Sequence, residues 1–211
     1  MSGRTRVKIC GLTRPEDAAA AAQLGADAIG LVFAGRSPRK LSVDMAAAIV
    51  AGLPPFVATV ALFMDDDPQL VEAVIRRLAP DLLQFHGLEN PEYCEFFGRR
   101  YLKAVPMAGF GTGAIVEAAR LHPRAAGLVL DGHGLGEAGG SGRTFEWSEA
   151  RTEGVPPLVV AGGLTPENVA DAVRIAAPWA VDVSSGVEAA PGVKDHGRME
   201  RFINEVRRVS C

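Results

Sequence analysis

Short apolar runs alternate with longer stretches of helical periodicity along the chain, and this alternation constrains the fold more than any other feature. Continuous apolar runs are typical of strands that are buried on both faces. The expected strands are residues 6–10, 28–33, 58–63, 82–85, 101–105, 127–130, 158–161 and 180–183. The expected helices are 15–24, 44–51, one opened by Asp67 and Pro68, 91–97, 114–121, a weak one at 147–152, 166–176 and 195–209.

Eight strand–helix units predict a parallel α/β fold, closed as a (β/α)₈ barrel with its helices outside. The 211 residues suit a single domain spanning 1–211, because such barrels need roughly 200 residues. With 48% hydrophobic residues the chain can bury a sizeable core. The alternative is an open flavodoxin-like or Rossmann sheet, which would need fewer strands or an additional domain.

Charge and composition narrow the class of protein further. The net charge is −3 and no basic block occurs, so we expect neither nucleic acid nor a membrane surface as a partner. No apolar run reaches the roughly 18 residues of a membrane span, and the start of the sequence lacks the apolar region of a secretory signal. Three widely spaced cysteines predict reduced thiols in a cytoplasmic protein that acts on a small molecule.

Polar and glycine residues follow the expected strands, at the end of the barrel where active sites lie. Gly162 and Gly163 follow the seventh strand, and Ser184, Ser185 and Gly186 follow the eighth. Backbone N–H groups of glycine-rich loops can bind an anion, and a short helix after Gly186 would add its dipole. The two loops therefore predict a phosphate site, although one glycine pair alone could be only a tight turn.

Two residues are candidates for acid–base chemistry. Asp131 follows the sixth strand, where burial would raise the pKa of its carboxyl group and suit it to act as an acid. Its alternatives are a helix cap or an ion pair. Cys10 ends the first strand, and its thiolate would be a competent base, but a free cysteine is more often a small buried apolar residue. Lys8 points the same way as Cys10 but one layer lower, so it is not expected to activate the thiol.

Arg39 and His86 are candidates for binding the substrate. Arg39, in the loop after the second strand, could hold a carboxylate with both arms of its guanidinium group, although Arg36 and Lys40 compete for this role. His86 could bind substrate or carry a proton, or could simply bond to backbone. The four histidines show no metal-ligand spacing, so no metal is expected. Residues 139–143 suggest a flap over the site and lack the ending of a nucleotide-binding P-loop.

Segments along the whole chain resemble phosphoribosylanthranilate isomerase of tryptophan biosynthesis. They are 7–13, 25–33, 37–39, 83–87, 130–131, 139–147, 161–164, 166–169, 181–188 and 191–195. The Cys-Gly pair at 10–11 and Ser-Ser-Gly-Val-Glu at 184–188 are the most specific. Two departures, Phe85 where leucine is usual and Arg143 where lysine is usual, touch neither Cys10 nor Asp131.

The resemblance implies an Amadori rearrangement of N-(5-phosphoribosyl)anthranilate to 1-(2-carboxyphenylamino)-1-deoxyribulose 5-phosphate, without a cofactor. It implies that Asp131 protonates the ribose ring oxygen and that Cys10 removes the proton from C2. Arg39 would hold the anthranilate carboxylate, and the loops after the seventh and eighth strands would hold the phosphate.

Three other functions are weighed against this one. The related barrel isomerase of histidine biosynthesis carries aspartate at the end of its first strand, where this chain has Cys10. A metal-dependent sugar-phosphate epimerase would need histidine and carboxylate ligands that the pattern lacks. A non-catalytic barrel that binds a phosphorylated ligand would not need both Cys10 and Asp131. A second substrate, and whether the chain is a monomer or a homodimer, cannot be inferred from the sequence.

Overall fold

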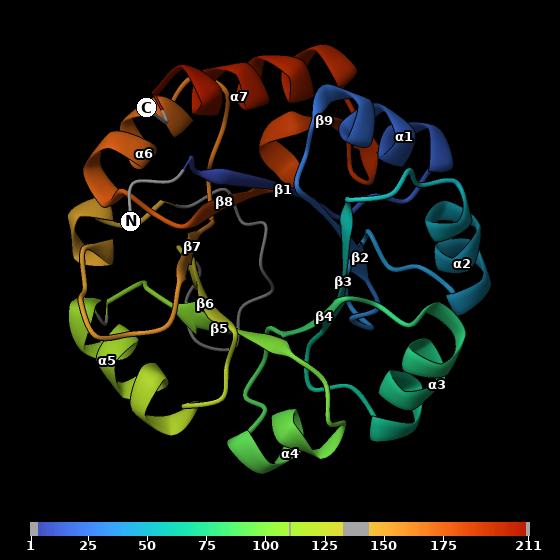
Figure 1. The fold of residues 1–211 in the computed structure, drawn as a ribbon, viewed down its shortest axis with the longest axis horizontal. Coiled ribbons are helices and arrows are strands. Elements are labelled where there is room, and N and C mark those ends of the chain that lie inside the picture. The colour runs from blue at the N-terminus through green and yellow to red at the C-terminus, as the bar shows by residue number, and fades with distance from the viewer. Residues whose placement is uncertain (1–3, 110, 133–143, 210–211) are drawn as a thin grey trace.

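The computed structural model describes residues 4–109, 111–132 and 144–209. Eight parallel strands form a closed barrel in the order β1 to β8, with β1 paired to β8, and helices surround it (Figure 1). The barrel strands are β1 (Arg6–Cys10), β2 (Ala28–Val32), β3 (Ala58–Phe63), β4 (Leu82–Phe85), β5 (Tyr101–Pro106), β6 (Gly127–Asp131), β7 (Leu158–Val160) and β8 (Ala180–Val183). The prediction of a closed parallel barrel is therefore confirmed.

The outer layer follows the strands in chain order. Its helices are α1 (Pro15–Leu24), α2 (Val43–Ala51), α3 (Pro68–Leu78), α4 (Pro91–Phe96), α5 (Gly111–Leu121), α6 (Val169–Ala176) and α7 (His196–Val209). Asp67 caps α3 by accepting a hydrogen bond from the Gln69 N–H at 2.8 Å, as its position before Pro68 predicts.

Several element bounds differ from the sequence expectation by one to three residues, and two parts of the chain differ more. The weak sixth helix is only a 3₁₀ turn, Trp147–Ala150, because Gly154 and the two prolines at 156–157 follow too closely for a longer helix. After β8, a second 3₁₀ turn, Ser185–Val187, leads into a short antiparallel hairpin of β9 (Glu188–Ala190) and β10 (Val193–Lys194). The hairpin was not predicted, because both of its strands are shorter than a readable alternation.

Two apolar layers hold the barrel together. Outward-facing strand residues such as Ile9, Phe63 and Phe85 pack against the helices and are completely buried. A second, smaller cluster fills the inside of the barrel; its buried members are Val60, Leu102, Ala104, Val129, Val159, Ala161 and Ala180. The inside of the barrel is thus packed, and polar residues are confined to particular levels within it.

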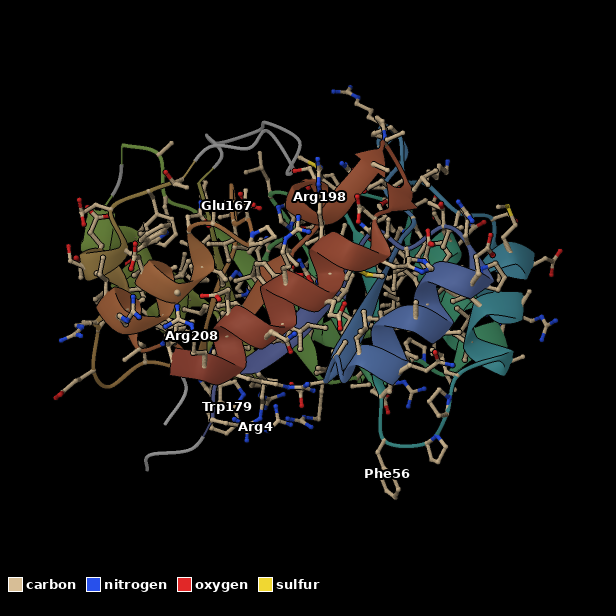
Figure 2. All side chains as sticks on the ribbon, turned by 90° about the horizontal axis from the view of Figure 1, so that it is seen from above. Arg4, Phe56, Glu167, Trp179, Arg198 and Arg208 are labelled. Carbon is tan, nitrogen blue, oxygen red and sulfur yellow. The ribbon has the colours of Figure 1, made fainter. Side chains whose placement is uncertain are left out.

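The side chains labelled in Figure 2 mark the two ends of the barrel. Arg4, Trp179 and the fully exposed Phe56 lie at one end, whereas Arg198 lies toward the other. Arg198 donates a hydrogen bond of 2.7 Å to the backbone carbonyl of Glu188, in the hairpin that follows β8. The latter end is therefore the one where the carboxyl ends of the strands open. Across the described ranges, no helix is both long and apolar enough to cross a membrane.

Candidate active site

A cavity of about 390 Å³ opens at the carboxyl ends of the barrel strands. It is lined by all nine residues that the sequence predicts for the site: Cys10, Arg39, His86, Asp131, Gly162, Gly163, Ser184, Ser185 and Gly186. These residues come from six different strand ends, so only closure of the barrel brings them together. Their proximity agrees with the prediction, while their chemical roles remain to be tested.

Cys10 lies at the floor of this cavity, where it is almost fully buried. Burial raises the pKa of the Cys10 thiol above its usual value, and the positive charge and hydrogen bond of Lys8 oppose that rise. Strand parity alone gave no reason to expect Lys8 near the thiol, yet a Cβ on Gly30 would lie 2.6 Å from Cys10 Sγ and 3.1 Å from Lys8 Nζ. A lysine side chain is long enough to span one layer of the barrel, and Lys8 Nζ reaches the level of the thiol.

Asp131 ends β6 and is also buried, close to His86 at the end of β4. His86 Nε2 lies 3.4 Å from Asp131 Oδ2, and Gln84 Nε2 lies 3.2 Å from His86 Nδ1. The His86 ring therefore lies between the Gln84 amide and the Asp131 carboxyl group. Gln84 and His86 thus lie in a row beside the Asp131 carboxyl group, at the edge of the cavity that all three line.

The loops after β7 and β8 form a glycine-rich wall. Gly162 and Gly163 both have positive φ, at 76° and 62°. The Asn168 amide stabilises this loop by donating to the Gly163 carbonyl at 2.9 Å and accepting from the Thr165 N–H at 2.8 Å. In the described part of the chain, the N–H groups of Gly163, Ser185 and Gly186 donate to no acceptor. Such free N–H groups at the edge of a cavity suit an anion.

Arg39 reaches the cavity edge but is not a free surface arginine. Its Nε and Nη2 donate to the two carboxylate oxygens of Glu188, each at 2.7 Å. Lys194 also binds Glu188 Oε1 at 2.8 Å, so one carboxylate serves two cations. Burial opposes ionisation of Glu188, but its two cationic partners lower the pKa of its carboxyl group. Among the rivals for this role, Arg36 lines the cavity and Lys40 does not.

Several polar residues of the site were not proposed for it from the sequence. They are Lys8, which was considered only as an activator of Cys10, and Gln84, Asp182, Glu188 and Lys194, all of them buried. For two of them the sequence held a clue. Alternate residues of a strand face the same side, so Lys8 faces the same side as Cys10, and Asp182 the same side as Ser184. The described residues contain no group of three or more histidine, cysteine or carboxylate side chains that could hold a metal ion. The flap predicted at 139–143 lies outside the described residues.

The closed barrel and the polar cavity at its carboxyl end place this chain among the (β/α)₈-barrel enzymes. Residues 7–205 match the family model described as N-(5'phosphoribosyl)anthranilate (PRA) isomerase. The chain therefore belongs to the phosphoribosylanthranilate isomerase family, as the sequence resemblance predicted.

Individual relatives agree with the family match over nearly the whole chain. The N-(5'-phosphoribosyl)anthranilate isomerase of Halorhodospira halophila is 55% identical, over 97% of this chain and 98% of the relative. The crystal structure of the Thermotoga maritima enzyme is 38% identical, with a TM-score of 0.88 over 97% of this chain and 99% of that one. A phosphoribosyl anthranilate isomerase in complex with reduced 1-(o-carboxyphenylamino)-1-deoxyribulose 5-phosphate is 36% identical, with a TM-score of 0.84 and coverages of 97% and 99%.

Proposed function

We propose that this chain catalyses the Amadori rearrangement of N-(5'-phosphoribosyl)anthranilate to 1-(2-carboxyphenylamino)-1-deoxyribulose 5-phosphate, a step of tryptophan biosynthesis. The family membership supports the reaction, and one structural observation carries its assignment to residues. A buried thiol on β1 and a buried carboxyl group on β6 line the same cavity, with glycine-rich loops beside them. An acid and a base held across one cavity suit a reaction that moves protons between neighbouring atoms.

The proposed chemistry assigns one proton transfer to each of these residues. Asp131 donates a proton to the ribose ring oxygen, the C1–O bond breaks, and the nitrogen lone pair forms the protonated Schiff base. The Cys10 thiolate then removes the proton from C2, and the electrons of that C–H bond form the C1–C2 double bond of the enolamine. Loss of the proton from the C2 hydroxyl and gain of one at C1 gives the ketone. The imine itself accepts the electrons, so the scheme requires no cofactor.

Freshly prepared N-(5'-phosphoribosyl)anthranilate tests the proposal directly. We expect its anthranilate fluorescence to disappear at a rate proportional to the concentration of this protein. Binding of the product without any decay of the substrate would contradict the proposal and favour a barrel that only binds a phosphorylated ligand.

We further propose that the loops after β7 and β8 bind the substrate phosphate. Replacing Gly186 with alanine should therefore raise KM at least about tenfold, the cost of roughly 1.4 kcal/mol of binding energy. A Cβ at position 186 would collide with the Leu164 carbonyl oxygen and lie 3.2 Å from Thr165 Cα. Both contacts are backbone atoms, so the two loops would have to separate. Steady-state kinetics and inhibition by inorganic phosphate measure the effect.

Gly113→Ala is the matched control, because a Cβ there, on α5, meets no atom within 4 Å. We expect that variant to keep the KM and the phosphate inhibition of the parent protein. If Gly186→Ala left both quantities unchanged, the phosphate would not bind at these loops.

Arg39 is proposed to bind the anthranilate carboxylate, with Glu188 holding its guanidinium group in place. Arg39→Ala should raise KM about 10–100-fold and change kcat little, because a hydrogen bond to a charged group contributes about 1.5–3 kcal/mol. Glu188→Gln should raise KM by a smaller factor, since Arg39 keeps its charge but loses one charged partner. Initial rates over a range of substrate concentrations separate the two parameters.

Lys40→Ala is the control for Arg39, since Lys40 is exposed and does not line the cavity. Arg36→Ala tests the rival directly. A KM that rises in Arg36→Ala and stays constant in Arg39→Ala would assign the carboxylate to Arg36.

Two further proposals concern the state of the protein. We propose that the enzyme works in the cytoplasm on its small-molecule substrate, without nucleic acid, as a monomer or a homodimer. Sedimentation equilibrium across a range of concentrations distinguishes the two assemblies.

A further inference from the structure

A buried ion pair borders the cavity through Asp182, and the acid–base scheme above does not use it. Lys8 Nζ lies 2.7 Å from Asp182 Oδ2, and both side chains are more than nine-tenths buried. The pair joins β1 to β8, because Lys8 and Asp182 are opposite one another in the register of these strands. Burying two charges is expensive, and an apolar pair could fill the same space. The position of this pair next to the reactive thiol suggests a role beyond stability.

Gly30 is the feature that brings the ammonium group to the thiol. It pairs with Cys10 in the register of β1 and β2. A Cβ at Gly30 would lie 2.6 Å from Cys10 Sγ and 3.1 Å from Lys8 Nζ. The sulfur and the ammonium group therefore border the same small space, which any side chain on β2 would occupy. The absence of a side chain here lets Lys8 extend upward to the thiol.

One oxygen of the ion pair's carboxylate lacks a partner among the described residues, and that carboxylate lines the cavity. This oxygen is Asp182 Oδ1, which is buried. The positive charge of Lys8 is therefore shared between one carboxylate oxygen and the thiol. Burial lowers the pKa of Lys8, but Asp182 and Cys10 outweigh this and raise it, so Lys8 stays charged.

The other charged groups around Cys10 are already committed to partners. Arg39, from the loop after β2, is held by both carboxylate oxygens of Glu188. Lys194, on β10, donates to the same carboxylate and to the Ser184 carbonyl at 3.1 Å. Four charged groups act on the thiol: Arg39, Lys194, Lys8 and Asp182. Of these, Lys8 and Asp182 are the two that are not bound to Glu188.

We propose that Lys8 is a positioning residue for this reaction: its ammonium group, held by Asp182, is the counter-charge of the Cys10 thiolate. The inference rests on the proposed role of Cys10 as the base. Lys8 does not touch the substrate. It stabilises the form of Cys10 that accepts the C2 proton, and Asp182 limits that stabilisation by neutralising part of the charge.

The direct test measures the thiol rather than turnover. Cys10 is alkylated with iodoacetamide across pH, and mass spectrometry of the peptide that contains Cys10 gives its rate separately from Cys94. Lys8→Met should lower the rate at pH 7.5 about tenfold, the effect of a shift of roughly one pKa unit. Asp182→Asn should raise the rate several-fold, because Lys8 keeps its charge and loses its carboxylate partner. Loosening of the barrel would expose the buried thiol and raise its rate in either variant, so the fall in Lys8→Met is the diagnostic result.

Two further variants separate Lys8 from its surroundings. Lys8→Met alone leaves Asp182 buried without a partner, so the decisive comparison is Asp182→Asn against the double variant Lys8→Met/Asp182→Asn. The double variant should react more slowly than Asp182→Asn but no more slowly than Lys8→Met, because the Asp182 carboxylate that opposes the thiolate is also gone. Lys103→Met is the matched control, because Lys103 is also a buried lysine in an ion pair, with Glu89 at 2.9 Å, and is not among the charges that act on Cys10. Its Cys10 rate should stay within about twofold of the parent.

Activity supplies an independent measurement. In Lys8→Met the rise of kcat with pH should move to higher pH while KM stays constant, and part of the lost rate should return in alkaline buffer. Equal Cys10 alkylation rates in Asp182→Asn and the double variant would overturn the proposal for Lys8. Full turnover by a Cys10→Ser variant would instead overturn the role of Cys10, so the two failures are distinguishable.

Discussion

Replacing Asp131 with asparagine should reduce kcat by about 10²–10⁴-fold and leave binding of the product nearly unchanged. General acids contribute this range, and the amide cannot donate a proton to the ribose ring oxygen as a carboxylic acid does. Asparagine has almost the same shape as aspartate, so it can keep the place beside His86, whose Nε2 lies 3.4 Å from the carboxylate in the parent. The cavity should therefore keep its form while losing its acid.

Stopped-flow turnover and calorimetric binding of the product measure the two quantities separately. Asp66→Asn is the comparison, because Asp66 also lines the cavity but binds the backbone N–H of Met64 at 2.8 Å. We expect it to lose far less activity than Asp131→Asn. Parent-like kcat in Asp131→Asn would remove Asp131 from the role of acid.

Replacing Cys10 with serine should cost a similar factor of about 10²–10⁴ in kcat, because a hydroxyl group ionises far less readily than a thiol. Cys10→Asp is the informative companion, since a carboxylate in the same place can also accept a proton. It should recover part of the activity that serine loses. If serine supported full turnover, Cys10 would be only a small buried residue of the barrel.

The pH dependence of these variants gives the sign of the effect. Burial raises the pKa of the Cys10 thiol, so most of it is protonated at neutral pH. The base form then grows about tenfold for each pH unit below that pKa, and kcat/KM of the parent should rise toward alkaline pH. In Cys10→Asp the base is already ionised at neutral pH, so this rise should vanish. An unchanged rise in that variant would mean that another group titrates.

The barrel was predictable because its strands are buried on both faces and therefore appear as continuous apolar runs. The runs at 6–10, 58–63, 82–85 and 180–183 match the observed strands residue for residue. The candidate residues were predictable for a related reason: a barrel gathers all its strand ends on one edge, so a polar residue after a strand is already placed near the others.

Partners across the barrel were not predictable in the same way. Glu188 holds Arg39 across 149 positions of sequence, and the geometry of that contact depends on a hairpin too short to read from alternation. The approach of Lys8 to the thiol was not predictable for a different reason. Strand parity gives the face of a residue but not the reach of its side chain, nor the space that Gly30 leaves for it.

The contacts that complete the cavity join the two ends of the chain. Lys8 on β1 meets Asp182 on β8, Arg39 meets Glu188, and the Lys194 N–H donates to Asp17 on α1 at 3.0 Å. A nascent chain that has not yet produced its last 30 or so residues contains Cys10 and Asp131 but lacks the partners that adjust their surroundings. We therefore expect catalytic competence to be acquired late in synthesis, when β8 docks against β1, and the reactivity of the Cys10 thiol to report that the barrel has closed.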